Sequence, residues 1–343
     1  MIDLLLQYGL FLAKTITIGV TALFIVGGLF SIFAKGRMEK KDHIEIKNLN
    51  NKFKGFARSI HAEILPKSEY KKLLNQEKAQ KKKERKKKQK DKATDSKSRI
   101  FVLNFVGDIK ASATEALRNE ITAILMVVRP NDQVMVRLES SGGMVHLYGL
   151  AASQLQRIKR ESIPLTVSVD KVAASGGYMM ACVADQIIAA PFAVIGSIGV
   201  VAQVPNFNRF LKERKIDFEQ FTAGKYKRTV TMFGKNTEED REKLREELEE
   251  THSLFQGFID SSRKNLDLER IATGEHWYGS KALELNLVDQ LMTGDDFLLS
   301  KSKEFDLFEI SYIVKKSILD RIPFISVNRL KRIFTEMNLR NLF

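Results

Sequence analysis

The chain has 343 residues, of which 44% are hydrophobic and 9% aromatic, so it can form packed domains and is not globally disordered. Its one cysteine, Cys182, excludes a disulfide within the chain, and no Cys/His cluster has the spacing of a zinc site. The net charge is +14, but residues 35–98 alone carry 22 Lys and Arg against 9 Asp and Glu. This confinement to one low-complexity stretch argues against nucleic-acid binding, which uses a folded basic surface.

The first 36 residues predict a membrane anchor. Residues 15–34 contain no charge and no proline, and as a helix they would be about 30 Å long, which matches the hydrocarbon core of a bilayer. A cleaved signal peptide is the alternative, but the apolar run is too long, and a cut after Ala34 places bulky Ile32 at position −3. More basic residues follow the span than precede it, so the positive-inside rule places the body in the cytoplasm.

Two further basic segments lie outside the anchor and the folded domain predicted below. Residues 37–98 predict a Lys-rich linker, because the like charges of residues 77–92 repel one another. A solvated spacer and a segment bound to anionic lipid headgroups are both consistent with this linker. Residues 301–343 predict a basic amphipathic tail, which packs at a subunit interface or lies on a membrane surface.

Residues 99–300 predict an α/β domain in which strands and helices alternate. Strands are expected at residues 100–105, 134–138, 165–169 and 187–190. Helices are expected at residues 114–128, 144–160 and 236–264. This order indicates a mostly parallel sheet with right-handed crossovers. The apolar run 183–204 is interrupted by Asp185, Gln186 and Pro191, so we interpret it as core rather than as a second membrane span.

Two glycine turns follow expected strands and precede expected helices. They are Ser140-Ser141-Gly142-Gly143 and Ala174-Ser175-Gly176-Gly177. The N–H groups at the start of a helix are unpaired, and glycine lets a carbonyl oxygen approach them, so two such turns suit the oxyanion of acyl transfer. Neither turn continues into Lys-Ser or Lys-Thr, which excludes a P-loop. Tight turns without a ligand are the alternative interpretation.

Ser175 is a candidate nucleophile, because it lies among small residues at a strand-to-helix turn, but it needs a base. We expect His146, His252 and His276 to be surface or packing residues. A lysine whose pKa is lowered by desolvation can replace histidine as the base. The composition of the segment Gly224-Lys225-Tyr226-Lys227 does not decide between its two lysines.

Together with Gly196-Ser197-Ile198-Gly199, these motifs resemble the signal peptide peptidase A family of Ser/Lys proteases, and its SohB branch in particular. The resemblance implies a crotonase/Clp-protease-like fold, ring-shaped homo-oligomers, no cofactor, and polypeptide substrates such as signal-peptide remnants. It also implies the periplasmic face of a bacterial inner membrane, against the charge rule. Ser141 departs from the family, which commonly has proline there, and serine leaves φ freer.

The resemblance also implies residue roles. Ser175 would be the nucleophile and Lys227 the general base, with Ser197 orienting the lysine amine. The N–H groups of Gly142 and Gly176 would form the oxyanion hole. The alternatives are a crotonase-like acyl-CoA enzyme with the same oxyanion hole and a non-catalytic membrane scaffold. The motifs favour a membrane-anchored serine endopeptidase.

Overall fold

The computed structural model describes residues 2–36, 42–90, 97–264 and 266–314. The chain divides into two units, one of residues 1–43 with 313–343 and one of residues 44–312. The first unit contains α1 (Ile2–Gly36). Within the described residues, one helical stretch, Gln7–Ile25, is long and apolar enough to cross a membrane, with a mean hydropathy of 1.7. The part of the expected tail from residue 315 onward lies outside the described residues.

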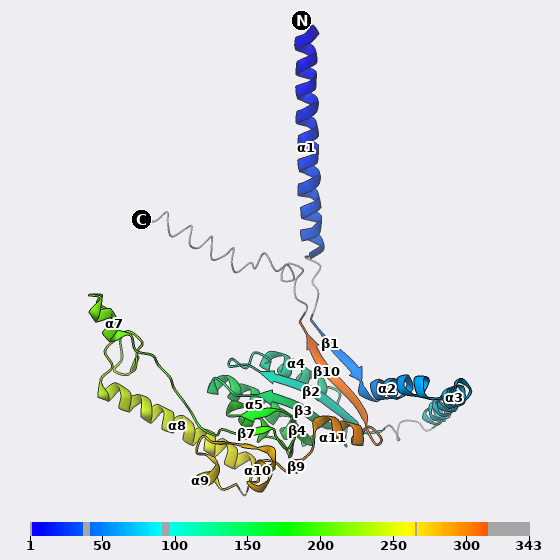
Figure 1. The fold of residues 1–343 in the computed structure, drawn as a ribbon, viewed down its shortest axis with the longest axis vertical. Coiled ribbons are helices and arrows are strands. Elements are labelled where there is room, and N and C mark those ends of the chain that lie inside the picture. The colour runs from blue at the N-terminus through cyan, green and yellow to red at the C-terminus, as the bar shows by residue number, and fades with distance from the viewer. Residues whose placement is uncertain (1, 37–41, 91–96, 265, 315–343) are drawn as a thin grey trace. The chain divides into compact units, whose positions relative to one another are not determined.

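The second unit is built on a sheet (Figure 1). Its strands are β1 (His43–Asn48), β2 (Arg99–Gly107), β3 (Gln133–Ser140), β4 (Leu165–Val169), β5 (Val172–Ala174), β6 (Gln186–Ala189), β7 (Val194–Gly196), β8 (His276–Tyr278), β9 (Gln290–Leu291) and β10 (Asp306–Ile313). The main order is β1-β10-β2-β3-β4-β6-β9, from which β5, β7 and β8 branch. The pairs from β10 through β2, β3, β4 and β6 to β9 are parallel, as the sequence predicts for an α/β domain.

The sheet carries helices between its strands. They are α2 (Leu49–Ile64), α3 (Lys67–Lys90), α4 (Thr114–Leu125), α5 (Val145–Arg160), α6 (Gly176–Ala181), α7 (Asn208–Glu213), α8 (Glu238–Ser262), α9 (Leu268–Ile271), α10 (Gly279–Glu284) and α11 (Gly294–Lys301). Each of the four expected strands and three expected helices overlaps an observed one, and β4 has the expected bounds.

Successive side chains of the central strands point to opposite faces of the sheet, and both faces are buried. In β2, Phe101, Leu103 and Phe105 pack into the larger core cluster, which includes buried residues of α4 and α5. The intervening Ile100 and Val102 pack into a second cluster, with buried residues of α2 and α11. A strand buried on both faces is an apolar run, which is why β2 is readable from the sequence.

The structure places residues 44–64 of the expected linker in the sheet unit. Strand β1 lies next to β10, and Leu49 of α2 is buried. The Asn50 side-chain amide donates to the carbonyl oxygens of Ser302 and Phe305 at 2.9 and 3.0 Å, and its oxygen accepts the Leu307 N–H at 2.7 Å. These partners lie more than 250 positions away in the chain, so local composition does not reveal them.

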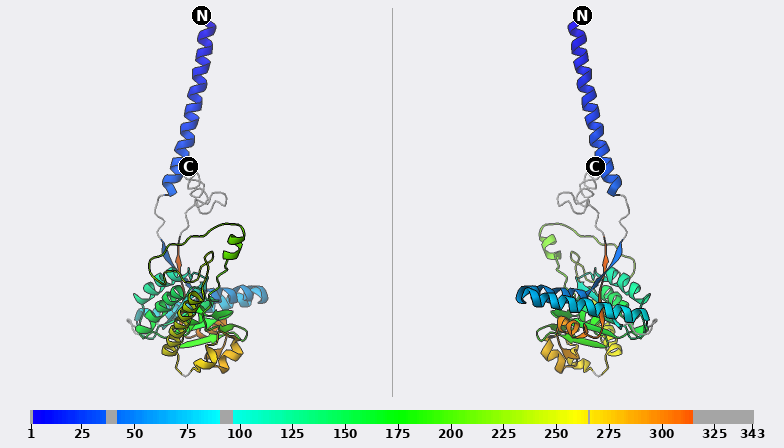
Figure 2. Two further views of the ribbon diagram at one scale, coloured as in Figure 1. Left: turned by 90° about the vertical axis from the view of Figure 1, so that its left-hand side faces the viewer. Right: turned by 90° about the vertical axis from the view of Figure 1, so that its right-hand side faces the viewer.

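Between β7 and α8 the chain makes a long excursion, residues 200–236, which we call the arm. Figures 1 and 2 show its helix α7 at a distance from the sheet. The arm exposes several aromatic side chains, and Phe221 is 89% exposed. The rings of Phe207 and Phe218 lie 6.0 and 5.8 Å from that of Phe233. Exposed aromatic rings at this density are typical of a surface that binds another chain.

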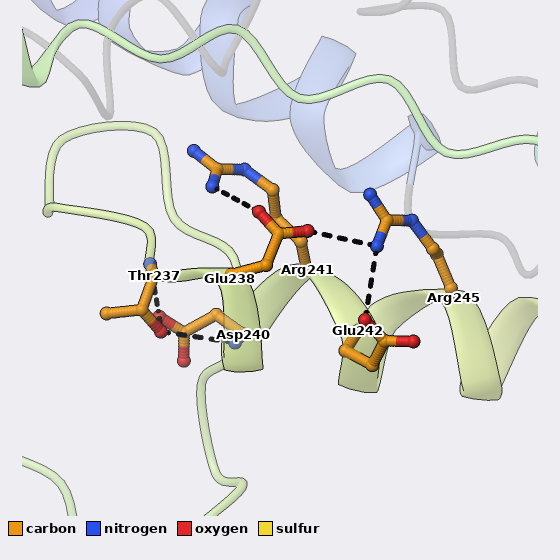
Figure 3. A network of polar contacts seen from close by, with 6 residues as sticks. All are labelled: Thr237, Glu238, Asp240, Arg241, Glu242 and Arg245. Carbon is orange, nitrogen blue, oxygen red and sulfur yellow. Dashed lines mark hydrogen bonds and ion pairs between the residues drawn. The ribbon is translucent and has the colours of Figure 1, made fainter.

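Helix α8 begins where the arm ends, at a capping box. Thr237 accepts the Asp240 N–H at 3.2 Å, and the Asp240 carboxylate accepts the Thr237 N–H at 2.8 Å (Figure 3). On the next turn Glu238 accepts from Arg241 at 3.0 Å and from Arg245 at 3.1 Å. The capping box fixes the start of α8, whereas the ion pairs of Glu238 are exposed to solvent; α8 carries one wall of the site described next.

Candidate active site

Ser175 lies at the turn from β5 into α6 in a backbone conformation that serine rarely adopts. Its φ is 52° and its ψ is −119°. Two hydrogen bonds hold it there: its N–H donates to the Gly196 carbonyl at 2.8 Å, and its own carbonyl accepts the Met179 N–H at 3.0 Å. A left-handed φ in a non-glycine residue costs about 1–3 kcal/mol and concentrates at functional sites.

Ser175 opens into a cavity of about 730 Å³. The first glycine turn contributes Ser141, Gly142 and Gly143 to the wall, and the segment after β7 contributes Ser197. The wall also contains apolar side chains, those of Ile109, Val200, Val201 and Leu248. The structure therefore brings both glycine turns and two of the predicted serines to one place.

Gly142 lies directly against the nucleophile turn. Its φ is +89°, and a Cβ there would lie 2.8 Å from the Ala174 carbonyl oxygen, the Gly176 nitrogen and the Ser175 Cβ. No larger residue fits, so the close approach requires glycine. The Gly176 N–H belongs to the first residue of α6 and has no partner within that helix.

The predicted oxyanion donor Gly142 has a different partner in this structure. Its N–H donates to the Ser140 Oγ at 3.1 Å. Gly142 and the next residue, Gly143, both line the cavity, but Gly143 is exposed, whereas Gly142 is buried. The turn that contains Gly142 thus lies in the expected position, but the Gly142 N–H donates to the Ser140 side chain rather than into the cavity.

The structure places Ser197 near the nucleophile but does not bring in Lys227. Ser197 has a left-handed φ of 51° and lines the same cavity as Ser175. Lys227, by contrast, lies in the arm, is exposed and does not line the cavity. Its backbone N–H donates to the Gly224 carbonyl at 3.2 Å.

The neighbouring Lys225 is in an environment that suits a charged amine. It forms an ion pair with Glu239 at 2.9 Å, and its Nζ lies 4.9 Å from the centre of the Tyr226 ring. Hydrogen bonding to Tyr226 and then to Glu239 raises the pKa of Lys225 above its ordinary value. A general base must be unprotonated, so this environment disfavours Lys225 as the base.

Helix α8 supplies cavity residues that sequence reasoning did not place there. His252, expected at the surface or in packing, lines the cavity together with Leu248 and Glu249. His252 lies three positions after Glu249 and four after Leu248, the spacings that bring residues to one helix face. The spacing is a usable signal, but nothing in the sequence says which face of α8 meets the glycine turns. Within the described residues, no cluster of His, Cys, Asp and Glu could hold a metal ion.

Two family models match the chain. Peptidase family S49 N-terminal matches residues 3–155, and Peptidase family S49 matches residues 157–307. The chain is 49% identical to the "Probable protease SohB" of Haemophilus influenzae over 325 residues, 93% of this chain and 92% of that protein. It is 50% identical to the protein of the same description in Buchnera aphidicola subsp. Acyrthosiphon pisum, over 93% of each.

Among solved structures, a 1510-N membrane-bound stomatin-specific protease bound to a substrate peptide matches with a TM-score of 0.42 and 13% identity. That match covers 66% of this chain and 96% of the other. The two family models and the identity over nearly the whole length show that the chain belongs to peptidase family S49 and is a protease.

Proposed function

We propose that this protease is a membrane-anchored serine endopeptidase with Ser175 as the nucleophile and Lys227 as the general base. The observation that carries the proposal is the strained turn of Ser175, which opens into a cavity shared with the Gly142–Gly143 turn and Ser197. The apolar stretch of α1 supports the anchor. The apolar part of the cavity wall supports apolar or unfolded polypeptides as substrates, signal-peptide remnants among them.

The proposed chemistry is acyl transfer. The neutral Lys227 amine takes the Ser175 hydroxyl proton while Oγ bonds to the peptide carbonyl carbon, and the carbonyl oxygen becomes an oxyanion. Collapse breaks the C–N bond, the leaving amine takes the proton from Lys227, and water then hydrolyses the acyl-enzyme. Ser197 orients the lysine amine. Each oxyanion donor contributes about 3 kcal/mol to the barrier reduction.

We propose Gly176 as one oxyanion donor and Gly143 as the other. The Gly176 N–H lies at the free end of α6, beside Ser175. Gly142 is the donor expected from the family resemblance, but its N–H is engaged by Ser140. Gly143 follows it in the same turn and lines the cavity, which supports its N–H as the second donor.

We propose further that Lys227 reaches the Ser175 of a neighbouring copy in a homo-oligomer. The arm that carries Lys227 is exposed along most of its length, and so are its aromatic rings. Packing of the arm against a second copy would bury these rings. It would also desolvate the Lys227 amine, which lowers the pKa of a lysine towards neutrality.

The dyad is tested by peptide hydrolysis with purified full-length variants. We expect Ser175→Ala and Lys227→Ala to abolish turnover and to leave thermal unfolding unchanged. Lys225→Ala is the matched control, an exposed arm lysine two positions away, and it should keep wild-type turnover. His252→Ala tests the rival base in the cavity. The dyad would be refuted if Lys227→Ala kept full turnover, or if His252→Ala were the only one of the two base variants to lose turnover.

A mixing experiment tests whether the lysine acts across copies. Ser175→Ala and Lys227→Ala are each inactive, but a co-assembled mixture contains contacts at which an intact serine meets an intact lysine. We expect co-expression of the two variants to restore part of the turnover. Size-exclusion chromatography with light scattering verifies that the mixture is oligomeric. An oligomeric mixture without activity would show that the lysine acts within its own chain.

A further inference from the structure

Behind the Gly142 turn lies a buried chain of hydroxyl groups that the proposed reaction does not use. The Ser140 Oγ and the Tyr148 Oη are 2.5 Å apart, and the Tyr148 hydroxyl donates to the Asp108 carbonyl oxygen at 2.8 Å. Tyr148 is fully buried, and Ser140 is 2% exposed. Buried polar groups at this depth in a catalytic domain need a structural or functional reason.

The direction of each hydrogen bond in this row of hydroxyl groups follows from the number of protons that each group can donate. Each hydroxyl has one proton, and that of Tyr148 goes to the Asp108 carbonyl. The Ser140 proton therefore goes to the Tyr148 oxygen, and the Ser140 oxygen keeps its lone pairs for the Gly142 N–H at 3.1 Å. Burial raises the pKa of Tyr148, which keeps it protonated and able to donate. The result is one continuous relay from the Gly142 N–H to the carbonyl of Asp108.

Close packing leaves this relay no room to move. A Cβ on Gly107 would lie 2.4 Å from the Tyr148 hydroxyl oxygen and 2.5 Å from the Ser140 Oγ. A Cβ on Gly176 would lie 2.4 Å from the Tyr148 ring, and one on Gly177 would lie 2.5 Å from the Ser140 carbonyl oxygen. Three glycines thus allow the two hydroxyl groups to approach the nucleophile turn from behind.

The relay acts on the peptide N–H of Gly142, in the loop that we propose carries an oxyanion donor. Residue 141, directly before Gly142, is a serine, and serine does not fix its own φ as the ring of a proline does. Gly142 itself has a φ of +89° and no side chain to restrain it. The bond from the Gly142 N–H to Ser140 is a direct polar restraint on this peptide, and it acts beside the packing of Gly142 against the nucleophile turn and the bond from the Met144 N–H to the Ile109 carbonyl at 2.9 Å. It fixes the peptide plane on one side of Gly142, and the close packing of Gly142 against the nucleophile turn transmits that orientation to the next peptide, which carries the Gly143 N–H.

We infer that Ser140 and Tyr148 are positioning residues that hold the Gly142–Gly143 turn in the conformation that donates to the oxyanion. This inference rests on the proposed function, because it presupposes acyl transfer at Ser175. The relay does not touch the substrate. Its loss therefore weakens transition-state stabilisation and leaves substrate binding largely unchanged, so it lowers kcat more than it raises KM.

The test compares two tyrosines that each lose one buried hydroxyl. In Tyr148→Phe we expect kcat to fall at least tenfold while KM stays within about twofold, since removing an oxyanion donor outright costs 10²–10³ in kcat. Tyr178→Phe is the matched control: Tyr178 is also fully buried, and its hydroxyl donates to the Leu287 carbonyl at 3.0 Å. We expect the control to keep its kcat. Thermal unfolding of both variants separates folding losses from catalytic ones.

Two further variants keep the test decisive. Ser140→Ala breaks the relay at its other hydroxyl and should lower kcat as Tyr148→Phe does, with no further loss in the double variant. Ser141→Pro adds a restraint on the φ of the residue before Gly142 and should raise the kcat of Tyr148→Phe. A wild-type kcat in both Ser140→Ala and Tyr148→Phe would overturn the inference, as would equal kcat losses in the two tyrosine variants or no gain from Ser141→Pro. Full activity of Ser175→Ala would instead overturn the proposed function itself.

Discussion

Adding one methyl group to Gly176 probes the packing that unites the nucleophile turn with α5. A Cβ at this position would lie 2.4 Å from the Tyr148 Cγ and 2.8 Å from its Cβ and Cδ1. Ordinary carbon contacts are about 3.5 Å or longer, so the ring or the turn must shift by about 1 Å. A shift of that size stretches the 2.8 Å hydrogen bond from Tyr148 to Asp108 beyond bonding distance.

We therefore expect Gly176→Ala to lower the free energy of unfolding by about 2–4 kcal/mol, the sum of overpacking and one lost buried hydrogen bond. Turnover should fall at least a hundredfold, because the Gly176 N–H moves away from the oxyanion. Stability is measured by urea unfolding in detergent, followed by the fluorescence of Trp277, the one tryptophan of the chain.

The control for this substitution is Gly257→Ala, in the C-terminal half of α8. Nothing lies within 4 Å of a Cβ at Gly257, so alanine should stabilise the helix by about 0.5–1 kcal/mol and leave turnover unchanged. If Gly176→Ala unfolds at the wild-type urea concentration and keeps its turnover, the contact with Tyr148 does not constrain the site, and the argument for tight packing behind Ser175 fails.

The remaining predictions concern two buried groups and one exposed group. Asp132 is 3% exposed, and its carboxylate accepts hydrogen bonds from the backbone N–H groups of Arg99 and Arg129 and, at 2.5 Å, from the Arg99 guanidinium. Asp132→Ala should therefore lower the free energy of unfolding, measured in urea, by about 3–5 kcal/mol. In contrast, Glu238→Ala, which removes exposed ion pairs, should cause no measurable change, and a large one would contradict the argument from burial. Burial opposes ionisation of Asp132, but the hydrogen bonds from Arg99 outweigh it and hold the pKa of this carboxyl below its usual range. The ionised Asp132 carboxylate therefore contributes its full stabilisation above about pH 3.9, the ordinary pKa of an aspartate. This contribution is lost as the pH falls through the lowered pKa of the folded state, and acid unfolding of wild type and Asp132→Asn measures the loss. Finally, burial raises the pKa of Cys182 to about 12, so a thiol reagent should label it only after unfolding; labelling of the native protein would show that this core opens.

Local patterns in the sequence predict the centre of the fold well. Strand β4 (Leu165–Val169) is buried at each position, and its sequence LTVSV alternates apolar and small polar residues with the period of a strand, which made it predictable. In contrast, β1 (His43–Asn48) is short and largely polar, and its place in the sheet depends on β10, more than 250 positions later. Composition cannot reveal such a pairing, because the energy lies in contacts between distant segments.

Some residues of the candidate site could likewise be predicted from local sequence patterns, and others could not. The glycine turns and Ser175 can be predicted because parallel strands end at one edge of a sheet, and the residues after them meet there. His252 could not be placed, since its helix reaches the cavity only after the arm has left and returned. The hydrogen bond between Gly142 and Ser140 was also out of reach, because a single torsion decides whether that N–H faces substrate or protein.

The insertion of β10 between β1 and β2 has a consequence for biosynthesis. The edge of β2 must wait for residues 306–313, which leave the ribosome about 200 residues later, or about 10–40 s at ordinary translation rates. Throughout that interval an apolar strand edge lacks its partner, and such edges attract other unfolded chains. A nascent chain truncated before residue 306 would already contain every proposed catalytic group, yet its sheet would stay open on that side.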